Sequence, residues 1–179
     1  MDTSVERARF NMVEQQVRPW EVTDRRVLDA LAEIPRERFV PDAYRDLAYA
    51  DIEVPIAAGQ TMLAPKIVGR MLQALDIKPA DRILEIGTGT GYTAACLSRL
   101  GGRVVSLELH KELAEQARER LEGLNQSNLE VRVGDALSGE IEGGPFDVIA
   151  VTGSLPDESA LSGLQERLAP NGRLFAIVG

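Results

Sequence analysis

Apolar positions in the second half of the chain alternate between short compact runs and helical repeats. The compact runs predict strands over residues 83–86, 104–107, 129–133, 146–151 and 173–178. Helical spacing predicts helices over residues 92–100, 111–121 and 158–168. The run 146–151 is almost wholly apolar, as expected of a strand that is covered on both faces. Strands that alternate with helices predict right-handed βαβ units, and hence a Rossmann-like, doubly wound α/β fold with a mostly parallel sheet.

The first 81 residues have a different pattern. Helical spacing covers residues 5–16 and 23–34, and Thr23 is predicted to cap the second of these helices. Prolines then interrupt the chain up to Pro65, which fits the first turn of a further helix over 66–75. The sequence therefore predicts an N-terminal helical and loop extension, residues 1–81, packed on a core of residues 82–179 as one folding unit.

Composition narrows the range of functions. With 179 residues, 44% of them apolar, the chain can build a core without disulfides or metals. Cys96 is the single cysteine, which fits a reducing cytoplasm, and no leader or bilayer-spanning run is expected. A net charge of −8 argues against nucleic acid as a partner, and one histidine leaves little for a metal site.

The chemistry is concentrated in a glycine-rich turn after the first core strand. Gly87, Gly89 and Gly91 allow a sharp turn and the close approach of a ligand, at the place where α/β sheets bind nucleotides. The dinucleotide fingerprint requires glycine or alanine where this chain has Tyr92, and no Gly-Lys-Ser/Thr follows as it would in a P-loop. Another nucleotide-like ligand is therefore expected.

Carboxylates at the ends of three successive predicted strands indicate which ligand the glycine turn binds. Glu85 precedes the turn, where an anion suits a ligand that carries an ammonium and a sulfonium group. Glu108 closes the second strand and can accept hydrogen bonds from both ribose hydroxyls. Asp135 follows the third strand, within reach of an adenine amino group. Together they predict a pocket for S-adenosylmethionine (SAM), formed by Glu85, Gly87, Thr88, Gly89, Gly91, Tyr92, Glu108, Leu109, Gly134, Asp135, Ala136 and Thr152.

The order of these segments resembles the class I methyltransferases and, more closely, the protein-L-isoaspartate O-methyltransferase family. The resemblance covers nearly the whole chain, and the loop Gly59–Thr61 is more specific than the glycine turn. It rests on residues 12–16, 27–31, 34–41, 55–61, 84–92, 133–136, 145–149 and 168–174.

That resemblance implies methyl transfer from SAM to the free α-carboxylate of an isoaspartyl residue in a damaged peptide or protein, with S-adenosylhomocysteine (SAH) as product. A carboxylate is already ionised at neutral pH, so the reaction needs no strong general base. Positioning of the reactants supplies most of the acceleration. An enzyme with one histidine can therefore perform it.

The chain departs from the family at Leu63, where the family carries a serine hydroxyl in the active site. Thr61, two residues earlier in an extended segment, is expected to replace that hydroxyl, and Lys66 is expected to supply charge. These three residues are the predicted acceptor site. Two alternatives stay open: an O-methyltransferase for another small-molecule or protein acceptor, and a protein that binds SAM without turnover.

A second departure is that the family usually continues beyond the equivalent of Gly179 into a closing antiparallel strand pair. The run 173–178 would then form an apolar edge strand, which is a template for pairing with another chain. The sequence thus predicts either truncation or a homo-oligomer that forms through this edge.

Overall fold

The computed structural model describes residues 3–155 and 157–178, so that Met1, Asp2, Pro156 and Gly179 lie outside the described residues. Its helices are α1 (Thr3–Asn11), α2 (Arg25–Glu33), α3 (Pro65–Leu75), α4 (Tyr92–Leu100), α5 (Lys111–Leu121) and α6 (Ser159–Gln165). Its strands are β1 (Val54–Pro55), β2 (Thr61–Met62), β3 (Arg82–Ile86), β4 (Arg103–Glu108), β5 (Leu129–Val133), β6 (Phe146–Leu155) and β7 (Leu168–Val178). A π-helix at Met12–Val17 and short 3-10 helices at Arg18–Trp20, Arg36–Arg38, Asp42–Leu47 and Ala57–Gly59 complete the described elements.

A five-stranded parallel sheet forms the centre of the molecule, in the order β5-β4-β3-β6-β7. The chain builds the sheet outward from β3 to β5 and then returns to the other side of β3 with β6. This reversal is the topological switch point of a doubly wound fold, where ligands bind at the carboxyl ends of the strands. The predicted fold class is therefore confirmed.

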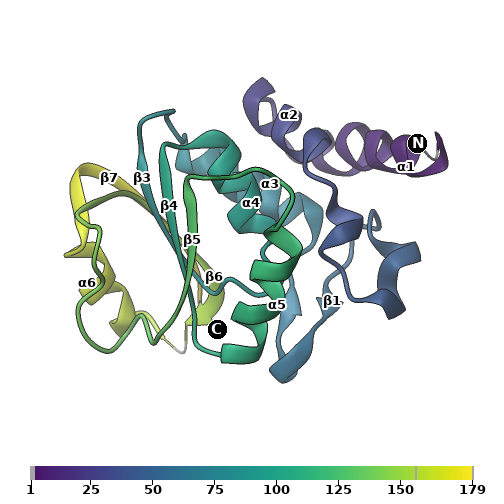
Figure 1. Ribbon diagram of the computed structural model, residues 1–179. Coiled ribbons are helices and arrows are strands. Elements are labelled where there is room, and N and C mark those ends of the chain that lie inside the picture. The colour runs from purple at the N-terminus through teal and green to yellow at the C-terminus, as the bar shows by residue number, and fades with distance from the viewer. Residues whose placement is uncertain (1–2, 156, 179) are drawn as a thin grey trace.

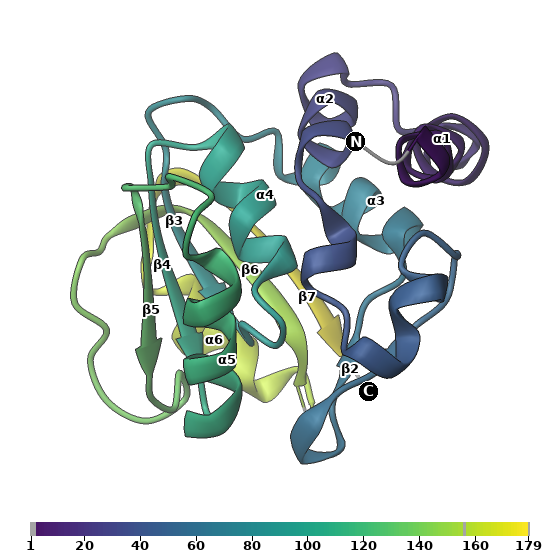
Figure 2. The same ribbon diagram turned by 45° about the vertical axis from the view of Figure 1, so that its right-hand side comes forward.

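Alternate residues of the central strands enter two different apolar clusters. Ile83, Val104 and Val148 face α3 and α4, whereas Leu84 and Ile149 face α6. The helices lie on both sides of the sheet in Figures 1 and 2. Because both faces are covered, the strands read as continuous apolar runs, and the pattern alone could not indicate which way each side chain points.

The N-terminal segment packs against the first of these faces. One buried cluster includes Met12, Leu31 and Leu72 of this segment together with Leu97 and Val148 of the core. Figure 2 places α1 and α2 beside α3, away from the sheet. That residues 1–81 and 82–179 fold as one unit stays a prediction.

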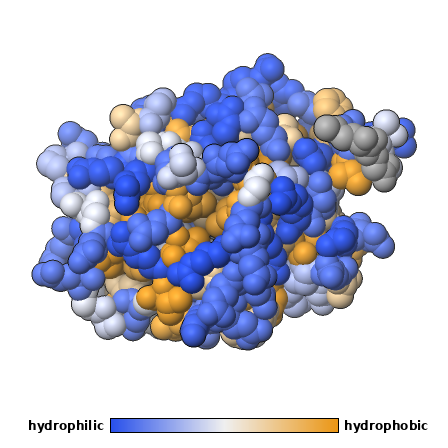
Figure 3. Space-filling model, in the orientation of Figure 1, coloured by the Kyte–Doolittle hydropathy of each residue, from blue (hydrophilic) through white to orange (hydrophobic). Residues whose placement is uncertain are grey.

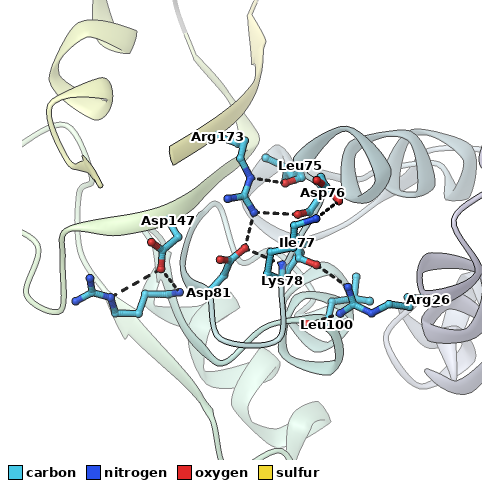
Figure 4. Close-up of polar contacts among 10 residues, drawn as sticks. Arg26, Leu75, Asp76, Ile77, Lys78, Asp81, Leu100, Asp147 and Arg173 are labelled. Carbon is cyan, nitrogen blue, oxygen red and sulfur yellow. Dashed lines mark hydrogen bonds and ion pairs between the residues drawn. The ribbon is translucent and has the colours of Figure 1, made fainter. Parts of the chain in front are cut away.

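Two arginines tie distant segments together at the amino ends of the strands (Figure 4). Arg173 of β7 donates through Nε to the Leu75 carbonyl oxygen at 2.8 Å and through Nη2 to that of Asp76 at 2.9 Å, and it pairs with the Asp81 carboxylate. The middle of β7, where Arg173 pairs with Val148 near the amino end of β6, is thereby anchored to the connection between α3 and β3.

The second of these arginines, Arg26 of α2, donates to the carbonyl oxygens of Ile77 at 2.7 Å and Leu100 at 2.9 Å. The bond to Leu100 joins the N-terminal segment to the core. Both bonds lie at the edge of the sheet opposite to the carboxyl ends of the strands, which stay open to a ligand.

Two local predictions need correction. Asp24, not Thr23, caps α2, because its side chain accepts a hydrogen bond from the Arg26 amide at 2.9 Å while the Thr23 amide donates to Gln73. The strand predicted over residues 146–151 is longer in the structure, because β6 continues to Leu155 past an irregularity in its pairing with β7. By contrast, α4 and α5 begin and end where the sequence predicted.

The surface drawn in Figure 3 is mostly hydrophilic, with apolar side chains visible in recesses between polar ridges. Within the described residues, no helix combines the length and the apolar character needed to cross a bilayer.

Candidate active site

The glycine turn lies at the switch point between β3 and β6. Gly87, Gly89 and Gly91 have φ angles of 98°, 53° and 93°, in the left-handed region that favours glycine. A Cβ atom on Gly87 would lie 2.5 Å from the backbone nitrogen of Gly153, so that β3 and β6 can approach only because this side chain is absent. The turn is therefore shaped by contact between two strands as well as by its own backbone.

Glu108, at the end of β4, holds this turn in place. Its Oε2 accepts a hydrogen bond from the Gly89 amide at 2.8 Å, and its Oε1 accepts one from the His110 amide at 3.0 Å. A carboxylate can accept about four hydrogen bonds, so that capacity for a ligand remains. Contact between Glu108 and a ribose stays a prediction. The two backbone hydrogen bonds hold the carboxylate in one orientation before any ligand binds.

Two adjoining cavities open along the carboxyl ends of the strands. One, of about 240 Å³, is lined mainly by residues that follow β3, β4 and β5, including Leu109, Gly134, Asp135 and Ala136. The other, of about 600 Å³, lies between the glycine turn and the β1–β2 segment. They share Gln60, Gly87, Glu108, Gly153 and Ser154 and so form one cleft.

The predicted cofactor residues divide into two groups. Those that line the cleft are Gly87, Gly89, Glu108, Leu109, Gly134, Asp135, Ala136 and Thr152. Those outside its lining are Glu85, Thr88, Gly91 and Tyr92, all four of which are buried. A role for the second group in direct cofactor contact stays a prediction, and their positions favour support of the turn instead.

Glu85 is fully buried beneath the turn, within a chain of hydroxyl groups. The Ser106 hydroxyl donates to Glu85 Oε2 at 2.6 Å, and Thr88 Oγ1 lies 2.6 Å from Ser106 Oγ. When Glu85 is ionised, Ser106 donates its proton to Glu85, and Thr88 is then the donor to Ser106. Burial, reinforced by the nearby Glu108, raises the pKa of Glu85 to about 8, against the lowering effect of the hydrogen bond from Ser106.

Thr152 closes the other side of the turn. Its Oγ1 lies 2.6 Å from the Gly87 carbonyl oxygen, 3.1 Å from that of Ile86 and 3.4 Å from Glu85 Oε1. A hydroxyl has one proton, and the shortest of these distances assigns it to Gly87. The Thr152 side chain thus links β6 to the turn while lining the larger cavity.

Two of the three predicted acceptor residues line the larger cavity. Thr61 and Leu63 both contribute to its wall, whereas Met62 between them is buried on the opposite side. This is the alternation expected of an extended segment. Lys66 does not line this cavity: its Nζ lies 2.9 Å from Asp51 Oδ2 and 4.5 Å from the ring centroid of Trp20. Its predicted contact with the acceptor stays untested.

A buried arginine supports the acceptor loop from behind. The Arg36 side chain is fully buried, and its Nε and Nη2 donate to the carbonyl oxygens of Ala48 and Leu63, each at 2.8 Å. Its guanidinium carbon lies 4.8 Å from the ring centroid of Tyr92, the first residue of α4. Arg36 therefore connects the acceptor loop to the helix that follows the glycine turn.

Sequence reasoning missed several walls of the cleft. Gln60 lines both cavities and lies within the Gly59–Thr61 loop, which was a usable signal. Phe175, on β7, also lines the larger cavity, and no local pattern marked it. Only the strand order brings this residue to a loop that lies more than a hundred positions earlier in the chain.

Fold and cleft together define a class I, SAM-dependent methyltransferase: a parallel sheet, a glycine turn at its switch point and an oriented carboxylate on the next strand. Comparison with known proteins identifies the branch. The chain belongs to the protein-L-isoaspartate(D-aspartate) O-methyltransferase family, whose sequence model matches residues 7–179.

Individual relatives agree with this assignment. A protein-L-isoaspartate O-methyltransferase of Koribacter versatilis is 47% identical over 171 residues, which are 96% of this chain and 76% of that protein. The enzyme of the same name from Aeropyrum pernix is 46% identical over 176 residues, which are 96% of this chain and 67% of that protein.

Solved structures show the same fold. A protein-L-isoaspartate O-methyltransferase superposes with a TM-score of 0.80 at 28% identity, over 97% of this chain and 55% of that chain. This chain thus spans about half the length of that protein. A Plasmodium falciparum structure, described as a putative protein-L-isoaspartate O-methyltransferase in complex with SAH, gives a TM-score of 0.78 at 23% identity, over 96% of this chain and 84% of that one.

Proposed function

We propose that this chain transfers the methyl group of SAM to the free α-carboxylate of an isoaspartyl residue in a peptide or protein and releases SAH. The observation that carries the proposal is that Thr61 and Leu63, from the loop typical of the family, line the same cavity as Gly87, Gly89 and Glu108. A methyl donor at the glycine turn and an acceptor at this loop would share one enclosed space.

The proposed reaction is an in-line displacement. A carboxylate oxygen of the acceptor forms a bond to the methyl carbon while the bond from that carbon to sulfur breaks, and the electron pair of the broken bond stays on sulfur. The acceptor is ionised at neutral pH, so no proton has to be removed. Because the anion and the sulfonium cation both become neutral, a cavity that replaces water around the two charges favours the transition state.

The walls of the larger cavity suit this loss of charge. Ile56, Leu63 and Ile67 supply apolar surface, and no lysine, arginine or histidine is among the described residues that line it. The sulfonium group is then the main positive charge that an acceptor carboxylate meets. We assign the neutral contact that orients this carboxylate to the Thr61 hydroxyl, and unchanged turnover in a Thr61→Val variant would refute that assignment.

The decisive experiment uses methyl-labelled SAM with an isoaspartyl peptide and the same peptide containing normal aspartate. We expect base-labile label on the isoaspartyl peptide alone, because methyl esters hydrolyse in base and the site is to accept a free α-carboxylate. A Leu63→Ser variant runs in parallel. If it gains activity, of the order expected for one charge-assisted hydrogen bond at roughly 1.5–3 kcal/mol, Leu63 tunes the acceptor site without abolishing it.

Leu63 favours a second candidate function, which is O-methylation of a different acceptor. Leucine cannot donate the hydrogen bond that the family serine provides. No label on either peptide, with SAH binding intact and Leu63→Ser equally silent, would support this candidate or a SAM-binding protein without turnover. Labelling of other carboxylate or hydroxyl acceptors would then separate those two.

Association between copies of this chain and its location in the cell also stay predictions. The outer edge of β7 has no strand partner among the described residues, so that a second copy could pair with it. A single monomeric species by sedimentation at high concentration would refute such an oligomer. Cys96 is fully buried and burial raises its pKa to about 12, so its thiol stays protonated and unreactive, and the cytoplasmic location rests on the sequence alone.

A further inference from the structure

A second depression adjoins the larger cavity on the side away from the predicted adenosine pocket. It has a volume of about 630 Å³ and is lined by Pro19, Trp20, Glu21, Ile67, Arg70 and Phe175. Two of these residues, Ile67 and Phe175, also line the larger cavity. The two spaces therefore share a wall, and a molecule that fills one can extend into the other.

The depression is lined by an exposed indole, whose ring is contacted by a lysine and whose backbone is held by an arginine. Trp20 is 51% exposed, an unusual position for so large an apolar side chain. Lys66 Nζ lies 4.5 Å from the centroid of its ring, and the Arg70 guanidinium donates to its carbonyl oxygen at 3.0 Å. An aromatic side chain fixed before binding loses little conformational entropy when a partner stacks on it.

The charges around the indole are already paired. Lys66 binds Asp51 at 2.9 Å, and Arg70 binds Glu21 at 3.0 Å. The depression therefore presents apolar and aromatic surface with little unbalanced charge. An apolar or aromatic side chain is a better occupant than a phosphate or a charged group.

We propose that this depression binds the stretch of acceptor polypeptide next to the methylated residue, with an apolar or aromatic side chain of that stretch packed on Trp20. The inference rests on the proposed function, because it takes the acceptor to be a residue within a chain. An extended chain advances about 3.3–3.6 Å per residue. A side chain two or three positions from the reacting carboxylate therefore lies roughly 7–11 Å from it along the chain and can enter the neighbouring depression. Activity should consequently depend on the residues that flank the isoaspartyl group.

The test exploits the fact that Trp20 is the only tryptophan in the chain. Two isoaspartyl peptides are compared that differ only at the positions two residues to each side of the isoaspartyl residue, phenylalanine in one and glycine in the other. Titrated into the protein with SAH present, the phenylalanine peptide should change the tryptophan emission at about tenfold lower concentration than the glycine peptide. The KM values for methylation should differ by a similar factor, with kcat nearly equal.

A Trp20→Ala variant should abolish this preference by raising KM for the phenylalanine peptide alone. Phe10→Ala provides the matched control, because Phe10 is likewise an exposed aromatic residue, 62% accessible, and lines neither cavity. It should keep the preference. The emission titration needs no variant, so that it remains informative even if Trp20→Ala folds poorly.

Failure of the inference and failure of the proposed function give different results. Methylation of both peptides with equal KM, or an emission that neither peptide changes while methylation proceeds, overturns the inference alone. Absence of label from both peptides and from a blocked isoaspartyl residue with no flanking residues overturns the proposed function and this inference with it.

Discussion

The Glu85→Gln substitution tests most directly whether the buried acid beneath the glycine turn is protonated at neutral pH. Glutamine keeps the size of the side chain and an oxygen that can accept the Ser106 hydroxyl proton, but it cannot ionise. The variant therefore removes the titration of this group and little else. Any pH-dependent difference in stability from the wild type then reports on Glu85 itself.

The size of the effect on the free energy of unfolding follows from the shift in the pKa of Glu85. Burial, reinforced by Glu108, raises the pKa of Glu85 from 4.5 to about 8 in the folded protein. At 1.36 kcal/mol per unit, the folded state disfavours the ionised form by about 5 kcal/mol relative to the unfolded chain. The folded state therefore binds more protons than the unfolded chain between these two pKa values. The contribution of this group to stability is full below pH about 4.5 and is lost as the pH rises through about 8.

The assay is urea unfolding at pH values from about 5 to 9, with the free energy of unfolding extrapolated to zero denaturant. The wild type should lose stability relative to Glu85→Gln by about 3.5 kcal/mol between pH 5 and pH 8. Glu119→Gln serves as control, since Glu119 is an exposed residue of α5 and its replacement should leave the wild-type pH dependence unchanged. Parallel pH profiles for wild type and Glu85→Gln would refute the inference that Glu85 is buried and largely protonated at neutral pH.

Three other substitutions test the parts of the cleft. Gly87→Ala should cost roughly 2–4 kcal/mol in urea unfolding and weaken SAH binding, because the new Cβ would lie 2.5 Å from the Gly153 nitrogen and φ is 98°. Arg36→Met should cost roughly 2–5 kcal/mol, since two backbone carbonyls lose their donor, and should raise KM for the acceptor more than Kd for SAH. Glu108→Gln should weaken SAH binding about 10- to 100-fold by calorimetry, because an amide cannot accept from two backbone N–H groups and a ribose as a carboxylate can. Unaltered binding in either cofactor-site variant would contradict the placement of SAM at this turn.

The secondary structure of the core was predictable because several local signals agreed. The helices α4 and α5 have helical apolar spacing and follow a glycine turn and a strand end, and both were located to the residue. The cap of α2 was misplaced by one residue, because Thr23 and Asp24 are both good caps and the amides of both donate to Gln73 in the structure. The hairpin of β1 and β2 was missed, because strands of two residues have no periodicity to detect.

The sequence predicted those site residues that lie at or just after the end of a strand, and only their position along the chain. Glu108 and Asp135 end or follow strands, and both line the cleft. Glu85 also stands near a strand end, but its carboxylate points under the turn toward Ser106. A strand covered on both faces has no alternation of apolar and polar residues, so that the sequence cannot indicate the direction of one side chain.

The acceptor side shows why an apolar substitution at the family serine is compatible with methyl transfer. A catalytic site that creates charge in the transition state needs donors or metal ions to stabilise it. Transfer of a methyl group from a sulfonium to a carboxylate removes a pair of charges instead, and attraction between that pair is strongest where water is excluded. Leu63, Ile56 and Ile67 give one side of the cavity an apolar wall, and the role proposed for Thr61 is to orient the acceptor through its hydroxyl. The expected cost of Leu63 is therefore the loss of one orienting hydrogen bond, which lowers the rate without removing the driving force of the reaction.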